Sequence, residues 1–68
     1  MNARDWIDAY AERLGIAAPT DDELRAILDL AAEAAHGSQR IAAPVACWMS
    51  ARAGRSLEDS IALAREVT

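Results

Sequence analysis

The chain has little of the material from which most small domains build a core or a reactive site. It contains no phenylalanine and 17 alanines among its 68 residues, so bulky apolar side chains are few. Its single cysteine excludes an intramolecular disulfide, and it has no signal-peptide pattern and no apolar run of about 18 residues. We therefore expect a cytoplasmic chain whose helices approach closely or share a core with another chain.

Lysine is absent as well, and the formal net charge of −4 leaves no basic surface of any size. Extended neutralisation of phosphates needs such a surface, so we expect no nucleic-acid partner and no membrane binding through a polybasic face; a DNA-binding helix-turn-helix is the weaker alternative. The residues that favour strands are scarce and never alternate, whereas alanine has the highest helix propensity. The composition predicts an all-α protein.

Four helices are predicted along one domain of residues 1–68. The first is capped by Asn2 and runs from about Ala3 to Leu14, and the second follows Thr20, which forms a capping box with Glu23. The third begins near Ala42 to Pro44, and the fourth follows a cap at Ser56. Gly15, Gly37 and Gly54 mark the ends of the first three helices, because glycine readily adopts the left-handed conformation that follows the last helical turn. Short connectors favour antiparallel neighbours in a compact bundle of four short helices.

The third helix is apolar nearly all round, which predicts a central position. Val45, Trp48, Met49 and Arg52 share one side of this helix, and small residues occupy the other. Small residues would let a neighbouring backbone come close. If Trp48 is fully buried, its loss should cost about 3–5 kcal/mol.

Few residues offer reactive chemistry. One cysteine and one histidine cannot supply a metal site, so we expect no metal and no cofactor. Cys47 with His36 as its base is a conceivable nucleophile, but a cysteine in an apolar helix behaves as a core residue, and we expect no catalytic residue. His36, Arg40 and the amides that open the third helix form a candidate anion site. The alternative is structural: His36 complements the helix dipole, while Arg40 pairs with a carboxylate or carbonyl of the second helix.

Several segments of the chain resemble an actinobacterial domain-of-unknown-function family of small helical proteins, found alone or fused behind molybdenum cofactor guanylyltransferase. The resemblance rests on Asp5-Trp6-Ile7, Leu14-Gly15, Ala35-His36-Gly37 with Arg40, and Ala42-Ala43-Pro44. It implies an accessory domain of molybdenum cofactor biosynthesis rather than an enzyme. The glycine-rich loop that a guanylyltransferase places after its first strand is absent from the chain.

These observations lead to two hypotheses of function. The first is a non-catalytic protein-interaction domain that binds a protein partner or forms a homodimer through an apolar patch containing Trp6, Tyr10, Trp48 and Met49. The second is a small anion- or nucleotide-binding domain that uses His36 and Arg40.

Overall fold

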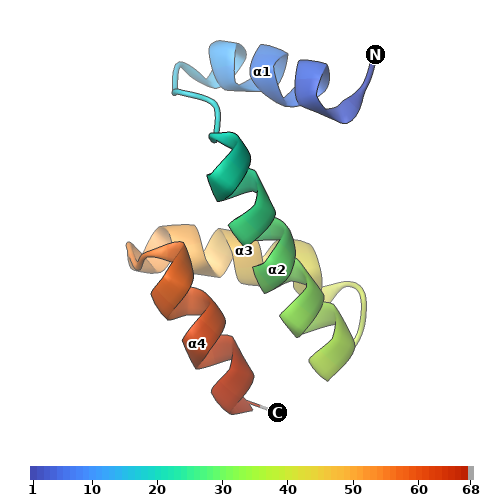
Figure 1. The fold of residues 1–68 in the computed structure, drawn as a ribbon, viewed down its shortest axis with the longest axis vertical. Helices are drawn as coiled ribbons and strands as arrows, with labels where there is room; N and C mark the ends of the chain where they lie inside the picture. The colour runs from blue at the N-terminus through green and yellow to red at the C-terminus, as the bar shows by residue number, and fades with distance from the viewer. Residues whose placement is uncertain (68) are drawn as a thin grey trace.

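The computed structural model describes residues 1–67 and contains four α-helices (Figure 1). They are α1 (Ala3–Leu14), α2 (Asp21–Gly37), α3 (Ala42–Ala53) and α4 (Leu57–Val67). No strand occurs in this range, so the prediction of an all-α fold of four short helices is confirmed. None of the helices in residues 1–67 is long and apolar enough to cross a membrane.

The helix starts follow the predicted capping residues. The side chain of Asn2 accepts a hydrogen bond from the amide of Asp5 (2.8 Å), as the hydroxyl of Ser56 does from the amide of Asp59 (3.1 Å). At α2, Thr20 Oγ1 accepts from the amide of Glu23, and Glu23 Oε1 accepts from the amide of Thr20. These bonds satisfy amides that the first turn leaves without partners, so each one fixes where its helix begins.

Two of the three predicted glycine caps are present. Gly15 and Gly54 adopt left-handed backbone conformations, with φ values of 76° and 70°. The prediction for Gly37 is wrong, because this residue is the last of α2 and has no positive φ. The following residue, Ser38, ends the helix with φ −150° and ψ −102°, and its hydroxyl donates to the carbonyl of Ala34 (2.8 Å). This bond gives the carbonyl of Ala34 a hydrogen-bond partner, which in a left-handed cap would be a backbone amide.

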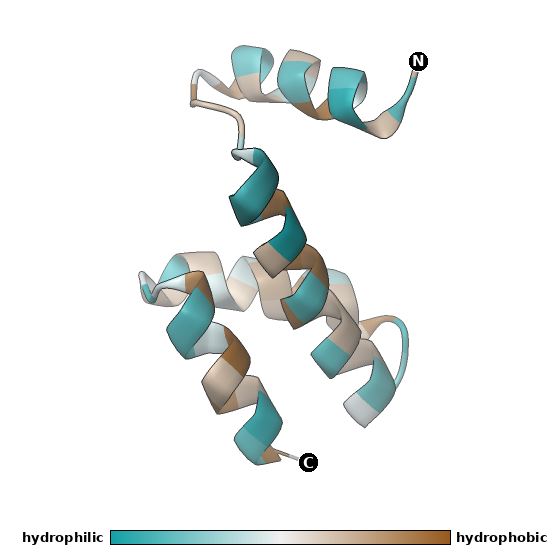
Figure 2. Cartoon of the chain, viewed as in Figure 1, coloured by the Kyte–Doolittle hydropathy of each residue, from teal (hydrophilic) through white to brown (hydrophobic). Residues whose placement is uncertain are grey.

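The centre of the fold is α2, which packs against both α3 and α4. Leu30 of α2 is only 3% exposed, whereas no residue of α3 is buried. The prediction that α3 is central is therefore wrong. Its small side, which includes Ala46, Cys47 and Ser50, is half-buried, and its bulky side faces solvent. Figure 2 shows how few hydrophilic residues α3 carries compared with the other helices.

Helix α1 lies across the N-terminal end of α2, and within residues 1–67 it packs along none of the other helices in the way that α3 and α4 pack along α2 (Figure 1). Residues 16–20 form an irregular connector, so α1 and α2 do not lie side by side as their short connector predicted. One side of α1 is nevertheless held by the rest of the chain. Ala11 is 5% exposed, Ile7 is half-buried, and Arg4 Nη1 lies 3.7 Å from Asp21 Oδ1.

Candidate functional site

The bulky residues of α3 and its preceding turn form an exposed surface. We call Ile41, Val45, Trp48 and Arg52 the outer face of α3, because their spacing of three to four residues places them on one side of the helix. All three apolar members are more than half exposed, with Trp48 at 63%. The guanidinium carbon of Arg52 lies 5.4 Å from the centre of the Trp48 ring, a cation–π contact that restrains both side chains.

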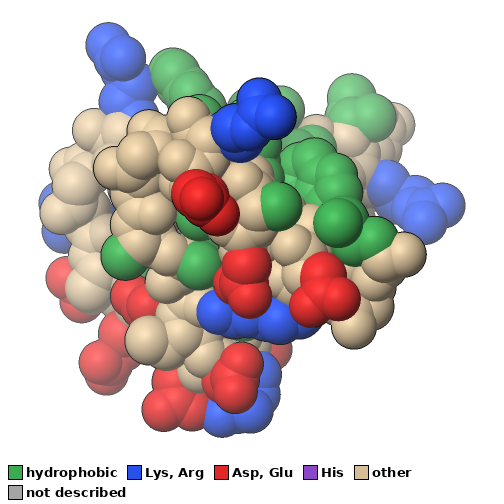
Figure 3. Space-filling model, turned by 90° about the horizontal axis from the view of Figure 1, so that it is seen from above, with side chains coloured by type: hydrophobic (Ala, Val, Ile, Leu, Met, Phe, Trp, Pro, Cys, Tyr) green, Lys and Arg blue, Asp and Glu red, His purple; other side chains and the backbone are tan. Residues whose placement is uncertain are grey.

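A second exposed surface follows one side of α1. Trp6, Tyr10 and Leu14 recur every four residues and are each more than half exposed; we call them the α1 ridge. The ring centroids of Trp6 and Tyr10 lie 4.9 Å apart with the ring planes tilted by 33°. In the view down onto the α1 end of the molecule, hydrophobic side chains lie at the surface between the charged groups (Figure 3).

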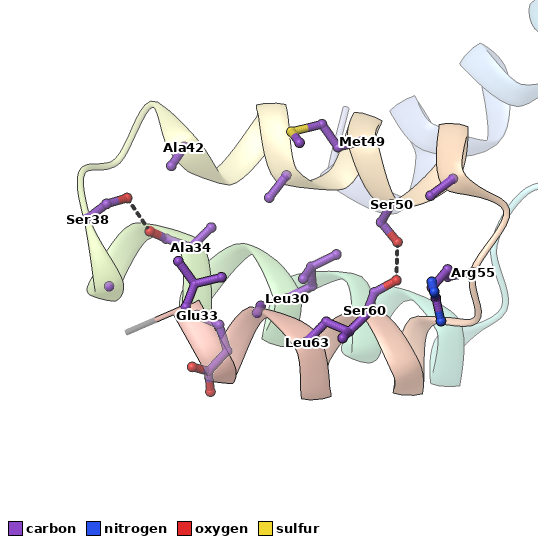
Figure 4. Close-up of a pocket in the computed structure, with 15 residues that line it drawn as sticks. Leu30, Glu33, Ala34, Ser38, Ala42, Met49, Ser50, Arg55, Ser60 and Leu63 are labelled. Carbon is purple, nitrogen blue, oxygen red and sulfur yellow. Dashed lines mark hydrogen bonds between the residues drawn. The ribbon is translucent and has the colours of Figure 1, made fainter.

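Between α3 and α4 lies a groove of about 440 Å³, which we call the α3–α4 groove (Figure 4). It exists because α2 packs against both helices, whereas α3 and α4 do not pack along each other. Its walls are almost entirely apolar, and many of its lining residues are small. Leu30 and Ala34 of α2 form its floor, and the hydroxyls of Ser50 and Ser60 share a hydrogen bond inside it.

Charged side chains stand at the two ends of the groove (Figure 4). Glu33 lies at the end where α2 and α4 finish, and its Oε1 accepts a hydrogen bond from Nε of Arg65 (2.9 Å). Arg55 lies at the other end, where α4 begins, and makes no ion pair within residues 1–67. The groove is thus an apolar slot with the Glu33–Arg65 ion pair at one end and Arg55 at the other.

The four predicted interaction residues fall on two helices. The structure places Trp6 against Tyr10 on α1, and it places Trp48 and Met49 on α3. Within residues 1–67 no aromatic contact links the two helices. Met49 lines the α3–α4 groove, whereas Trp48 lies outside it.

Sequence reasoning missed the groove itself. Its walls consist largely of alanine and serine, which carry no strong pattern in a chain so rich in alanine. The available signal was the small side of α3, which implied a close neighbour but not a gap beside it.

The predicted anion site has little to hold it in shape. His36 and Arg40 are exposed, and within the described part of the chain neither side chain makes a hydrogen bond or an ion pair. The predicted contact of Arg40 with α2 is therefore not formed. The amides of Ala42 and Ala43 donate to the carbonyls of Gln39 and Arg40, so two of the amides at the start of α3 are already used. Binding of an anion by His36 and Arg40 stays a prediction.

Cys47 lies on the packed side of α3. Its Sγ is 4.0 Å from the carbonyl oxygen of Ile27, and burial raises the pKa of the thiol above its usual value. A raised pKa leaves less thiolate at neutral pH, so the environment disfavours nucleophilic chemistry at this residue. No group of three or more metal-binding side chains converges within residues 1–67.

Comparison with known protein families gives a match over the full length of the chain. A family model described as Domain of unknown function (DUF6457) matches residues 1–68, and the chain therefore belongs to this family. No curated protein and no solved structure matches it.

Proposed function

We propose that this member of the DUF6457 family is a cytoplasmic, non-catalytic interaction domain whose protein partner docks on the outer face of α3. The observation that carries the proposal is the orientation of α3. A thin core would gain most from burying Trp48, yet this side chain is 63% exposed and stands in line with two other exposed apolar residues.

The chemistry of this face is typical of interaction sites. Tryptophan and arginine are the residues most enriched among those that dominate binding energy, and here Arg52 lies over the ring of Trp48. The contact restrains both side chains before binding, which lowers the conformational entropy lost on association. Ile41 and Val45 extend the apolar surface along the same side of the helix.

The family resemblance supports a particular partner. The resemblance noted in the sequence implies relatives that are fused behind molybdenum cofactor guanylyltransferase in actinobacteria, so we propose this enzyme as the protein that the outer face binds. A domain on a separate chain would then bind the enzyme as a second protein, whereas a fused domain is kept beside the enzyme by the covalent link. This assignment gives the chain an accessory role in molybdenum cofactor biosynthesis without chemistry of its own.

Calorimetric titration of guanylyltransferase with the chain tests the proposal. If Trp48 is a dominant contact, Trp48→Ala should weaken binding by at least about tenfold. Leu28→Ala is the matched control, because Leu28 is a similarly exposed apolar residue on α2, outside the outer face. Its Kd should stay within about twofold of the wild type, the change expected for a residue outside the contact. Absence of binding by the wild-type chain, or equal losses in the two variants, would contradict the proposal.

A further inference from the structure

The α3–α4 groove is apolar between its two polar ends. We propose that it binds a fatty carboxylate, with the unbranched tail along the groove and the carboxylate beside Ser50, Ser60 and Arg55. This inference goes beyond the proposed function, which concerns the outer face of α3 and a protein partner.

The groove is too narrow for a helix but wide enough for one hydrocarbon chain. Its lining residues run along α3 from Ala42 to Ala53, a rise of about 17 Å. A volume of about 440 Å³ over that length leaves a cross-section of roughly 25 Å², whereas a helix about 10–12 Å across needs roughly 80 Å² or more. Carbon atoms in contact lie about 3.5–4.0 Å apart, so a single methylene chain fits this cross-section. The dimensions therefore favour a thin, unbranched ligand.

The middle of the groove suits the tail of such a ligand. Leu30 and Ala34 form the floor, and Ala46, Met49 and Leu63 contribute to the walls. None of these side chains carries a group that a methylene chain would leave without a hydrogen bond. The volume of about 440 Å³ also lies within the range of about 300–1,000 Å³ that is typical of small-molecule sites.

Charge places the carboxylate at the Arg55 end. The charged residues that line the groove are Glu33 and Arg55. Glu33 is paired with Arg65, whereas Arg55 makes no ion pair within residues 1–67. The first-turn acids of α4, Glu58 and Asp59, are exposed and do not line the groove. An anionic head is therefore attracted to Arg55, where the start of α4 adds the positive end of a helix dipole.

Two serine hydroxyls in the same half of the groove have one O–H group without an acceptor. Ser50 of α3 and Ser60 of α4 share a hydrogen bond, and neither hydroxyl has another partner within residues 1–67 (Figure 4). Two hydroxyls carry two protons and the shared bond uses one of them, so the other can donate to a ligand. Ser60 is only 8% exposed, which limits the access of water to this donor. A carboxylate has one negative charge and two acceptor oxygens, which matches one guanidinium and one O–H group.

A titration of the full chain, labelled with carbon-13 at its methionine methyl groups, tests binding in the groove by NMR. The chain has two methionines: Met49 lines the groove, whereas Met1 is 91% exposed and lies outside it. Octanoate added up to about 3 mM should shift the Met49 methyl resonance and leave that of Met1 unchanged, with a Kd of about 1 mM or below. No shift of Met49, or equal shifts of the two methyl groups, would overturn the proposal.

The length of the ligand tests the position of the tail. A methylene group that is fully buried strengthens binding by about fourfold, so octanoate should bind at least about fourfold more tightly than hexanoate. Equal affinities for the two acids would overturn the proposal, because the tail would then lie outside the groove.

Arg55→Gln separates recognition of the carboxylate from burial of the tail. It should raise the Kd of octanoate at least about threefold and leave that of octanol within about twofold, since the alcohol carries no charge. Arg40→Gln is the matched control, because it removes the same charge from an exposed arginine outside the groove and should leave the Kd of octanoate unchanged. Equal losses in the two variants, or a loss in Arg40→Gln alone, would overturn the proposal.

Filling the groove should weaken both ligands. Ala64→Leu enlarges a half-buried wall residue of α4 and should raise the Kd of octanoate and of octanol alike. Leu63→Glu, at an exposed wall position, is the second variant if Ala64→Leu lowers the helix content measured by circular dichroism. It places a negative charge in the groove and should weaken octanoate more than octanol. Unchanged binding in a variant with wild-type helix content would overturn the proposal.

The outer face of α3 separates this inference from the proposed function. Trp48→Ala should leave the Kd of octanoate unchanged, because Trp48 lies outside the groove. Arg55→Gln should in turn leave the binding of guanylyltransferase unchanged, because Arg55 lies outside the outer face. Failure of the octanoate titration thus does not affect the calorimetric test, and failure of the calorimetric test does not affect the titration.

Discussion

Leu30 and Trp48 provide a direct test of which helix forms the core. Leu30 is 3% exposed at the centre of α2, and a buried leucine replaced by alanine typically costs about 2–5 kcal/mol. A chain of 68 residues is expected to have a free energy of unfolding of about 3–10 kcal/mol. Leu30→Ala should therefore remove a large part of the total stability.

Trp48→Ala should cost less. The ring is 63% exposed, so roughly 75 Å² of about 200 Å² is covered, which corresponds to about 2 kcal/mol at 25 cal/mol per Å². The unfolded chain already covers part of this area, and alanine is the better helix former, so the net cost falls to about 1 kcal/mol. Losing the cation–π contact with Arg52 adds about 0.5–1 kcal/mol, so the total is at most about 2 kcal/mol, the lower limit for Leu30→Ala.

Urea denaturation followed by circular dichroism at 222 nm measures both values. The two variants and the wild type should be compared at one protein concentration and again at a tenfold dilution, because any dimer stabilises the folded chain by mass action. The ranking should be the same at both concentrations. A loss in Trp48→Ala equal to that in Leu30→Ala would show that α3 is the buried helix and refute the packing described above.

Three further predictions concern local structure. Thr20→Ala removes the hydroxyl that caps α2 and should lower the free energy of unfolding by about 1 kcal/mol in urea denaturation, while Thr20→Ser should retain most of it. Gly54→Ala should cost about 1–2 kcal/mol in the same assay, since its φ is 70°; no atom lies within 4 Å of an added Cβ, so the cost is conformational, and Gly54→Asn should lose less. Burial raises the pKa of Cys47, so over a range of alkaline pH the folded chain keeps its thiol proton while the unfolded chain loses it. The contribution of this thiol to the free energy of unfolding is therefore present below the usual thiol pKa and is lost as the pH rises through the higher pKa of the folded chain. The urea midpoint should fall less over that range in Cys47→Ala than in the wild type.

The helix boundaries could be read from the sequence because they depend on local bonds. Asn2, Thr20 and Ser56 each accept from an amide three residues ahead, and such a bond needs nothing from the rest of the fold. Gly37 shows the limit of this reasoning. Whether it adopts a left-handed conformation depends on its neighbour Ser38, whose hydroxyl bonds to the carbonyl of Ala34 instead.

The position of α3 could not be read in the same way. Periodicity shows which residues share a side of a helix but not which side meets the protein. In most domains the bulky side is buried, whereas here Ala46, Cys47 and Ser50 lie on the packed side and Trp48 faces solvent. The sequence did predict that the interaction candidates are exposed, because the core has few bulky residues. It did not predict that they lie on two separate surfaces, on α1 and α3, because this depends on how both helices are placed around α2.

The same packing explains how so apolar a helix can lie at the surface. Ala11 and Leu30 are the buried hydrophobic residues in the described part of the chain, at 5% and 3% exposed, which is very little for a domain that must offset its own conformational entropy. Small residues bring α2, α3 and α4 together with few bulky groups, so the large side chains remain available on the α1 ridge and the outer face of α3. A partner that covers those surfaces would stabilise the folded chain by binding it in preference to the unfolded chain. The chain's stability should therefore rise when guanylyltransferase is added and covers the outer face of α3, and Trp48→Ala should remove this gain.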